Sequence, residues 1–186
     1  PPARRGALPG SSTGPLWRGK GNGGDGPTKP FGDASGIAGT PDSKTLAFTA
    51  RIAGRTEAWS TNLDIWTVPA DGSAKPQNLT AANLATDTTP LFTRDGQAII
   101  YKAMKRAGFE ADRLAMMLKD LKTGATREIS PAWDRSADAF DLSADGRSLY
   151  LSAEDLGQKP LFKMDLASGK IDKLTGAGTV SGFSLG

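Results

Sequence analysis

Residues Pro90–Ala103 read PLFTRDGQAIIYKA, and they give the clearest indication of the architecture. A short apolar segment leads to Thr93, then after one variable residue to Asp95 and Gly96, and a second apolar segment follows. An aspartate folds its carboxylate onto nearby backbone NH groups, and glycine tolerates a positive φ angle, so Asp-Gly favours a tight turn. The stretch therefore predicts two β-strands joined by a turn.

The same pattern occurs three times along the chain. Its other copies, IAGTPDSKTLAFTA and AFDLSADGRSLYLSA, begin at Ile37 and Ala139. The aspartates of the three copies, Asp42, Asp95 and Asp145, lie 53 and 50 residues apart. A recurring pattern at this spacing indicates a repeat architecture in which each copy is one structural unit.

Each copy is followed by a second and a third element. The second elements end in glycine-containing turns: DIWTVPADGS from Asp64, LAMMLKDLKTG from Leu114 and LFKMDLASGK from Leu161. The third elements close each unit: PQNLT to Thr80, TREIS to Ser130 and IDKLT to Thr175. Each unit is thus predicted to be a four-stranded antiparallel sheet of about 45 to 53 residues, the size of a β-propeller blade.

The predicted fold is all-β: an incomplete β-propeller of about three four-stranded antiparallel blades plus the first strand of a fourth. We expect blades at about 36–80, 89–130 and 139–175, and the start of the next blade at 176–186. Residues 1–35 are rich in proline and glycine and are expected to form an irregular arm outside the repeat. An open arc of blades exposes a strand edge. We therefore expect packing against another copy or against the rest of a longer polypeptide.

One segment carries a competing helical signal. Leu114, Met117, Leu118 and Leu121 follow the i, i+3, i+4, i+7 spacing of an amphipathic helix. The repeat aligns this segment with DIWTVPADG and LFKMDLASG, which lack that spacing. We therefore predict a strand here.

Composition excludes several kinds of chemistry. The chain has no histidine and no cysteine, which removes disulfides, thiolate catalysis and the usual zinc ligands. No cofactor or metal is expected. The net charge of +3 comes from interspersed basic and acidic residues, so no nucleic-acid partner is predicted. No apolar run is long enough to span a bilayer, and periplasmic and cytoplasmic locations are both compatible with the sequence.

The segment GFSLG, residues 182–186, matches the G-x-S-x-G pattern of α/β-hydrolase nucleophiles. A nucleophilic serine needs a base, normally a histidine, and the chain has none. In the repeat register Ser184 is the counterpart of Thr40, Thr93 and Ser143, so GFSLG is predicted to be a propeller strand. This chain alone is therefore not expected to catalyse hydrolysis.

The repeats resemble the blades of the propeller domains in prolyl oligopeptidase-family serine peptidases. The segment AWSTNLDI, Ala58–Ile65, is similar to one in the dipeptidyl-peptidase and acylaminoacyl-peptidase branch. The resemblance implies that the propeller caps a separate α/β-hydrolase domain, which carries the catalytic residues, and that it limits entry to small peptides. The chain departs from the family after Ala38, where Gly39-Thr40-Pro41-Asp42 replaces an expected Ser-Pro-Asp.

The resemblance implies a peptide substrate that meets the loops between strands. Two long connections are the candidates, Arg51–Asn62 and Lys102–Asp112. The candidate contacts in them are Glu57, Trp59, Asn62 and Glu110. Either glutamate could pair with a peptide ammonium group. The alternative for both is a solvated charge at a loop tip.

Two other functions fit the same repeats. The first is a Tol-Pal-like propeller that binds a protein partner and has no catalytic domain. The second is a polysaccharide-acting propeller enzyme with paired carboxylates about a cleft. Asp42, Asp95 and Asp145 are the carboxylates that this function would use, but the pattern assigns them to turns.

Overall fold

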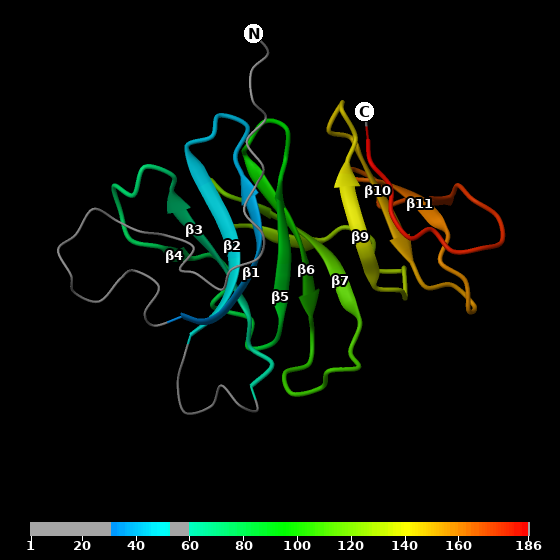
Figure 1. Cartoon of the computed structure of the whole chain (residues 1–186), viewed down its shortest axis with the longest axis horizontal. Helices are drawn as coiled ribbons and strands as arrows, with labels where there is room; N and C mark the ends of the chain where they lie inside the picture. Colours follow the sequence, from blue (N-terminus) through cyan, green and yellow to red (C-terminus); the bar gives the residue numbers. More distant parts are fainter. Residues whose placement is uncertain (1–30, 53–59, 186) are drawn as a thin grey trace, which may run out of the picture.

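The structure, a computed structural model, describes residues 31–52 and 60–185. They form three antiparallel sheets of four strands each, which follow one another in chain order across the molecule (Figure 1). The first sheet contains β1 (Phe31–Gly39), β2 (Thr45–Ile52), β3 (Asp64–Pro69) and β4 (Gln77–Asn78). The second contains β5 (Asp87–Phe92), β6 (Ala98–Met104), β7 (Leu114–Asp120) and β8 (Thr126–Glu128). The third contains β9 (Ala137–Leu142), β10 (Ser148–Ala153), β11 (Leu161–Asp165) and β12 (Ile171–Lys173).

Within each sheet the strands are hydrogen-bonded in chain order, as a four-stranded meander. The predicted all-β architecture of three four-stranded units is confirmed. Up-and-down strands place the β1–β2, β5–β6 and β9–β10 turns at one end of the sheets, the turn end. The longer β2–β3, β6–β7 and β10–β11 connections leave from the opposite end, the loop end.

The three turns at the turn end share one hydrogen-bond pattern. The Thr93 hydroxyl donates to Asp95 Oδ1 at 2.6 Å, and the Gln97 amide donates to the same oxygen at 3.0 Å. The corresponding hydroxyl-to-carboxylate distances in the other sheets, Thr40 to Asp42 and Ser143 to Asp145, are 2.7 and 2.6 Å. The hydroxyl and amide donors lower the pKa of all three carboxyl groups. These aspartates are therefore engaged in turns, as predicted.

Apolar side chains fill two interfaces between neighbouring sheets. The first seam, between the first and second sheets, contains Ala47, Ile65, Phe92, Ile99 and Tyr101. The second seam, between the second and third sheets, is larger and includes Ile100, Met116, Leu142, Leu149, Leu151, Phe162 and Met164. Each sheet thus buries its faces against its neighbours, as the blades of a propeller do.

Strand β7 resolves the competing helical signal. Met116 and Leu118 point into the second seam, whereas Met117 packs in the first. This alternation is that of a strand with both faces covered, so apolar residues occupy successive positions and imitate a helical stripe. The predicted strand is confirmed.

The chain after β12 forms no strand within the described residues up to 185. It nevertheless enters beside the third sheet as the linker after β4 enters beside the first sheet. Thr179 forms a parallel bridge with Lys159, which corresponds to the bridge between Thr86 and Leu63 in the first sheet. The Val180 amide donates to the Lys159 carbonyl at 2.8 Å, as the Asp87 amide donates to the Leu63 carbonyl at 2.7 Å.

Candidate functional site

The two long connections predicted from the sequence lie next to each other at the loop end. The Gly108 amide, in the β6–β7 connection, donates to the Thr61 hydroxyl at 2.8 Å, at the base of the β2–β3 connection. The Thr86 hydroxyl, in the linker between the sheets, donates to the Thr61 carbonyl at 2.6 Å. Three segments far apart in the sequence therefore meet at one surface.

Two of the four candidate contacts can be placed. Glu57 and Trp59 lie outside the described residues. Glu110 is exposed near the tip of the β6–β7 connection, and no hydrogen bond or ion pair joins it to another described residue. Its carboxylate is open to a ligand at the loop end.

Asn62 faces inward. In the orientation that satisfies both ends of its amide, the Asn62 side-chain nitrogen donates to the carbonyls of Asn83 and Ala85, at 3.2 and 3.1 Å. These bonds fix the base of the β2–β3 connection to the linker between the first two sheets. A role for Asn62 in substrate contact stays a prediction.

The β6–β7 connection is held in shape by Asp112. Its Oδ2 accepts hydrogen bonds from the amides of Arg106 and Lys105, at 2.7 and 3.2 Å, and its Oδ1 lies 3.4 Å from Arg106 Nε. The Arg106 guanidinium in turn lies over the Phe109 ring, 4.0 Å from its centre. Phe109 is 44% exposed beside Glu110, so the loop presents an aromatic group and a carboxylate together. Sequence reasoning missed Arg106, which carries no motif.

Beneath the loops, the first seam contains two buried carboxyl groups. Asp87 is 1% exposed and Asp64 is 4% exposed. Asp87 Oδ1 accepts from the Asn83 amide at 3.0 Å, and its Oδ2 has no hydrogen-bond partner in the described part of the chain. Burial raises the pKa of Asp87 to about 6, and the neighbouring charge of Asp64 adds to this. Burial also raises the pKa of Asp64, and the Thr80 hydroxyl lies 3.4 Å from its Oδ1.

These carboxyl groups are peculiar to the first seam. Asp64 pairs with Ala50 as Ala115 pairs with Ala103, so Ala115 is its counterpart one sheet later. Asp87 likewise corresponds to Ala137, which pairs with Ala153. Both alanines are buried, and Ala137 packs in the second seam. Because Asp64 and Asp87 are also buried, they cannot contact a peptide at the surface, and we assign them to the seam.

Charged pairs continue along the loop end to the third sheet. Arg113 Nη2 lies 2.5 Å from Glu128 Oε1, and Arg113 Nη1 donates to the Trp133 carbonyl at 2.8 Å. Asp155 accepts from Arg135 at 2.6 Å and from Lys173 at 3.0 Å. These charges are mutually compensated, which leaves Glu110 as the less constrained carboxylate of this surface.

Two kinds of site discussed from the sequence, a metal site and a serine nucleophile, can be examined in the described residues. They contain no group of three or more acidic, histidine or cysteine side chains that could hold a metal ion. Ser184 is exposed in a segment without secondary structure, with no histidine in the sequence to activate it. The described part also has no helix of the length and apolar character that a membrane crossing requires.

Comparison with known proteins finds distant similarity between these repeats and a group of peptidases. No family model matches the chain. Dipeptidyl-peptidase 5 from Porphyromonas gingivalis is 29% identical over 150 residues, which cover 80% of this chain and 22% of that protein. The chain is distantly similar to the propeller region of dipeptidyl-peptidase 5. The resemblance to prolyl oligopeptidase-family peptidases inferred from AWSTNLDI is thus confirmed. Dipeptidyl-peptidase 5 from Trichophyton schoenleinii is 31% identical over 147 residues, 74% of this chain and 20% of that protein.

Solved structures share the fold. TolB from Acinetobacter baumannii superposes with a TM-score of 0.58 at 20% identity, over 76% of this chain and 32% of that one. A puromycin-hydrolyzing peptidase from Mycobacterium tuberculosis gives a TM-score of 0.57 at 18% identity, over 80% of this chain and 24% of that one. The three sheets therefore resemble β-propeller blades of TolB and of peptidases. The chain spans about a fifth of the length of the curated relatives it matches.

Proposed function

We propose that this chain is a substrate-gating propeller portion of a dipeptidyl- or acylaminoacyl-peptidase-like serine exopeptidase. The three sheets act as consecutive blades, and residues 176–186 begin the next blade. The observation that carries the proposal is the joining of the two long connections at one end, by the 2.8 Å bond from Gly108 to Thr61. The similarity to dipeptidyl-peptidase 5 supplies the peptidase context. Hydrolysis itself would take place on an α/β-hydrolase domain, not on these sheets.

The gate would act by exclusion and orientation. The tied loops narrow the approach to the loop end, so a short extended peptide passes more easily than a folded chain. Glu110 offers a carboxylate that no described residue pairs with, for the ammonium group at the start of a peptide, and Phe109 offers an apolar neighbour for its first side chain. We propose that Glu57 and Trp59 extend this surface from the β2–β3 connection.

Shortening the β6–β7 connection tests the gate. Replacing residues 106–111 of the intact protein with two glycines should raise kcat/KM for a long peptide about tenfold relative to a chromogenic dipeptide substrate, because exclusion is relaxed. Replacing residues 71–75 in the β3–β4 turn, at the opposite end of the sheets, is the matched control and should leave the ratio unchanged. An unchanged ratio in the loop variant would refute the gate.

A second candidate is a binding module for a protein partner, favoured by the likeness to TolB. The two functions differ in whether the intact protein carries a reactive serine. Labelling of the intact protein with a fluorophosphonate supports the peptidase. Absence of labelling, together with capture of a protein partner at the loop end, supports the binding module.

A further inference from the structure

At the turn end, two arginines fill the second seam. Arg94 Nη2 donates to the Leu142 carbonyl at 2.6 Å, and its Nε donates to the Ser143 carbonyl at 3.2 Å. Arg127 Nη2 donates to the Leu166 carbonyl at 2.5 Å. Both guanidinium groups reach from the second sheet to backbone oxygens of the third and close the seam.

The first seam has the same backbone but neither arginine. Pro41 holds the turn position of Arg94, one residue before the aspartate. The packing supports this correspondence, because each residue lies next to the equivalent turn glycine of the next sheet. A Cβ at Gly96 would lie 3.4 Å from Pro41 Cδ, and a Cβ at Gly146 would lie 3.3 Å from Arg94 Cγ. The register also places Gln77 at the position of Arg127, because Gln77 pairs with Thr67 as Arg127 pairs with Leu118.

The acceptors of the two arginines have direct counterparts in the first seam. By the same register, Phe92 corresponds to Leu142 and Leu121 to Leu166. Within residues 36–52 and 60–185, no side chain donates to the carbonyl of Phe92 or of Leu121. In the second seam these two backbone oxygens accept hydrogen bonds from guanidinium groups. Their counterparts in the first seam therefore have no side-chain donor among the described residues.

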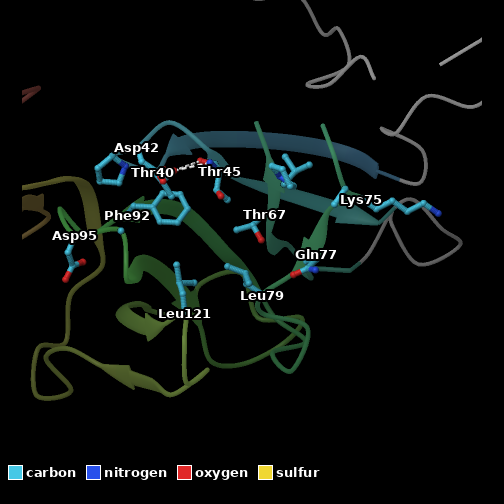
Figure 2. Close-up of a pocket in the computed structure, with 15 residues that line it drawn as sticks. Thr40, Asp42, Thr45, Thr67, Lys75, Gln77, Leu79, Phe92, Asp95 and Leu121 are labelled. Atoms are coloured by element: carbon cyan, nitrogen blue, oxygen red, sulfur yellow. Dashed lines mark hydrogen bonds between the residues drawn. The ribbon is translucent and has the colours of Figure 1, made fainter. Parts of the chain in front are cut away.

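A pocket of about 550 Å³ occupies this place. Pro41, Gln77, Phe92 and Leu121 all line it, with Leu79 on its apolar wall (Figure 2). The two seams also differ in width at this end. A Cβ at Gly169 would lie 2.3 Å from the Ile129 carbonyl oxygen, whereas a Cβ at Gly124, its counterpart, would meet nothing within 4 Å. The first seam is therefore open where the second is closed.

The pocket has a negative margin. Asp42 and Asp95 both line it, and the two residues lie at the same side of the view in Figure 2. The Thr40 and Thr93 hydroxyls, followed by backbone amides, lower the pKa of these carboxyl groups. Both aspartates are therefore ionised at neutral pH. Lys75, the basic residue of the lining, lies at the opposite side of the view.

From these features we propose that the pocket in the first seam binds an arginine side chain presented by a peptide segment of a partner protein. The guanidinium would donate to the carbonyls of Phe92 and Leu121, with Asp95 compensating its charge. The alkyl stem would lie along Leu79 and the Phe92 ring. A planar guanidinium with five donors can reach two separated carbonyls, which a lysine ammonium matches less well. This site lies at the turn end and is independent of the gate.

Peptide binding to the intact protein tests the site. The probe is acetyl-Gly-Arg-Gly-amide, and the controls are the lysine and citrulline peptides, measured by calorimetry. We expect saturable binding of the arginine peptide and at least about tenfold weaker binding of the citrulline peptide, which lacks the charge. Absence of saturable binding of the arginine peptide, or equal binding of the citrulline peptide, would overturn the proposal.

A variant that fills the pocket with a side chain of the protein itself provides a second test. Gln77→Arg installs the residue that the second seam uses and should abolish peptide binding while leaving the urea midpoint unchanged or higher. Asp95→Asn should weaken binding through loss of charge without filling the pocket. Undiminished binding to a folded Gln77→Arg protein overturns the proposal. Binding that emerges only after Arg4, Arg5 and Arg18 are replaced by glutamine also overturns it, because the occupant is then the chain's own N-terminal segment.

Discussion

Ser43 occupies the turn position that Gly96 and Gly146 hold in the second and third sheets. Its φ is 59°, close to the 68° and 69° of the two glycines. A residue with a Cβ is strained in this left-handed region, by about 1–2 kcal/mol, whereas glycine is not. Asp42 and Thr40 still form their turn bonds, so the repeat imposes the conformation on Ser43.

Ser43→Gly should therefore stabilise the protein. We expect the free energy of unfolding to rise by about 0.5–1 kcal/mol, less than the strain because glycine also gains freedom when unfolded. Urea unfolding measures the change. The reciprocal variant, Gly96→Ser, should lower the free energy of unfolding. A loss of stability in Ser43→Gly contradicts this account of the turn.

Asp87 makes the stability depend on pH in an unusual direction. Its pKa is about 6 in the folded protein, raised from an ordinary value of 3.8. The stabilisation associated with the raised pKa is fully present below pH 3.8 and is lost as the pH rises through about 6. The shift corresponds to up to about 3 kcal/mol. Neutral pH therefore weakens the first seam.

Asp87→Asn removes this titration and keeps the acceptor for Asn83. We expect the variant to gain stability over the wild type as the pH is raised from 4.5 to 7.5, by about 2 kcal/mol, the part of the full shift that falls in this range. Urea unfolding of both proteins across this range gives the difference, and the turn aspartates cancel because both proteins contain them. Parallel stability curves for the two proteins would show that Asp87 is not protonated in the fold.

At the scale of single elements, the β7–β8 and β11–β12 turns form a matched pair. Gly124 and Gly169 have φ angles of 76° and 71°. Among the described residues, the turn of Gly169 packs on the preceding sheet and that of Gly124 does not; the Ser130 hydroxyl donates to the Gly169 carbonyl at 2.8 Å. The two turns thus share their backbone conformation and differ in their contacts.

Alanine at these two positions separates strain from packing. Gly124→Ala should cost about 1 kcal/mol, the cost of a Cβ at positive φ. Gly169→Ala should cost at least about 2 kcal/mol more, because its Cβ would meet the Ile129 carbonyl oxygen at 2.3 Å. Urea unfolding of both variants measures the difference. Equal losses would contradict the closed geometry of the second seam.

Elements that follow the repeat could be predicted from the sequence, and elements that interrupt it could not. The turn aspartates predicted the β5–β6 and β9–β10 hairpins correctly, because an Asp-Gly turn is formed by bonds between residues that are close in the sequence. Strand β7 could be predicted only by aligning it with the other repeats. Both of its faces are covered, so its sequence lacks the polar–apolar alternation that identifies a strand. Strand β1 begins at Phe31, and its register shifts between Phe31 and Ala34 and between Ser35 and Ile37 break the alternation that a sequence pattern requires.

The site was less predictable than the fold because it depends on contacts between sheets. The loops around Glu110 could be found by their length in the repeat. Asp64 and Asp87 could not be found from the sequence. Asp64 begins a strand and Asp87 follows a polar linker, and the two carboxyl groups come close only where the first two sheets pack together. The pocket beside Pro41 and Gln77 shows up only when the two seams are compared in space.

At the scale of the whole molecule, the two ends of the sheets differ in how closely they follow the repeat. The first turn of each sheet, at the turn end, keeps the same hydroxyl–carboxylate bond, whereas the connections at the loop end vary in length and sequence from sheet to sheet. Variable connections on a repeated scaffold are where binding surfaces are usually built. Because the chain has no histidine, the proposed function assigns hydrolysis to a separate hydrolase domain and the access surface to these sheets.

The location of bound peptide in the intact protein tests this account most directly. p-Benzoylphenylalanine would replace Glu110 at the loop end or, as a control, the exposed Lys122 at the turn end. After irradiation with a non-hydrolysable dipeptide analogue that contains no arginine, and so has no side chain for the pocket beside Leu121, we predict a crosslink from position 110 and none from position 122. A crosslink from position 122 alone, or from neither position while the analogue still inhibits hydrolysis, would contradict a gate at the loop end.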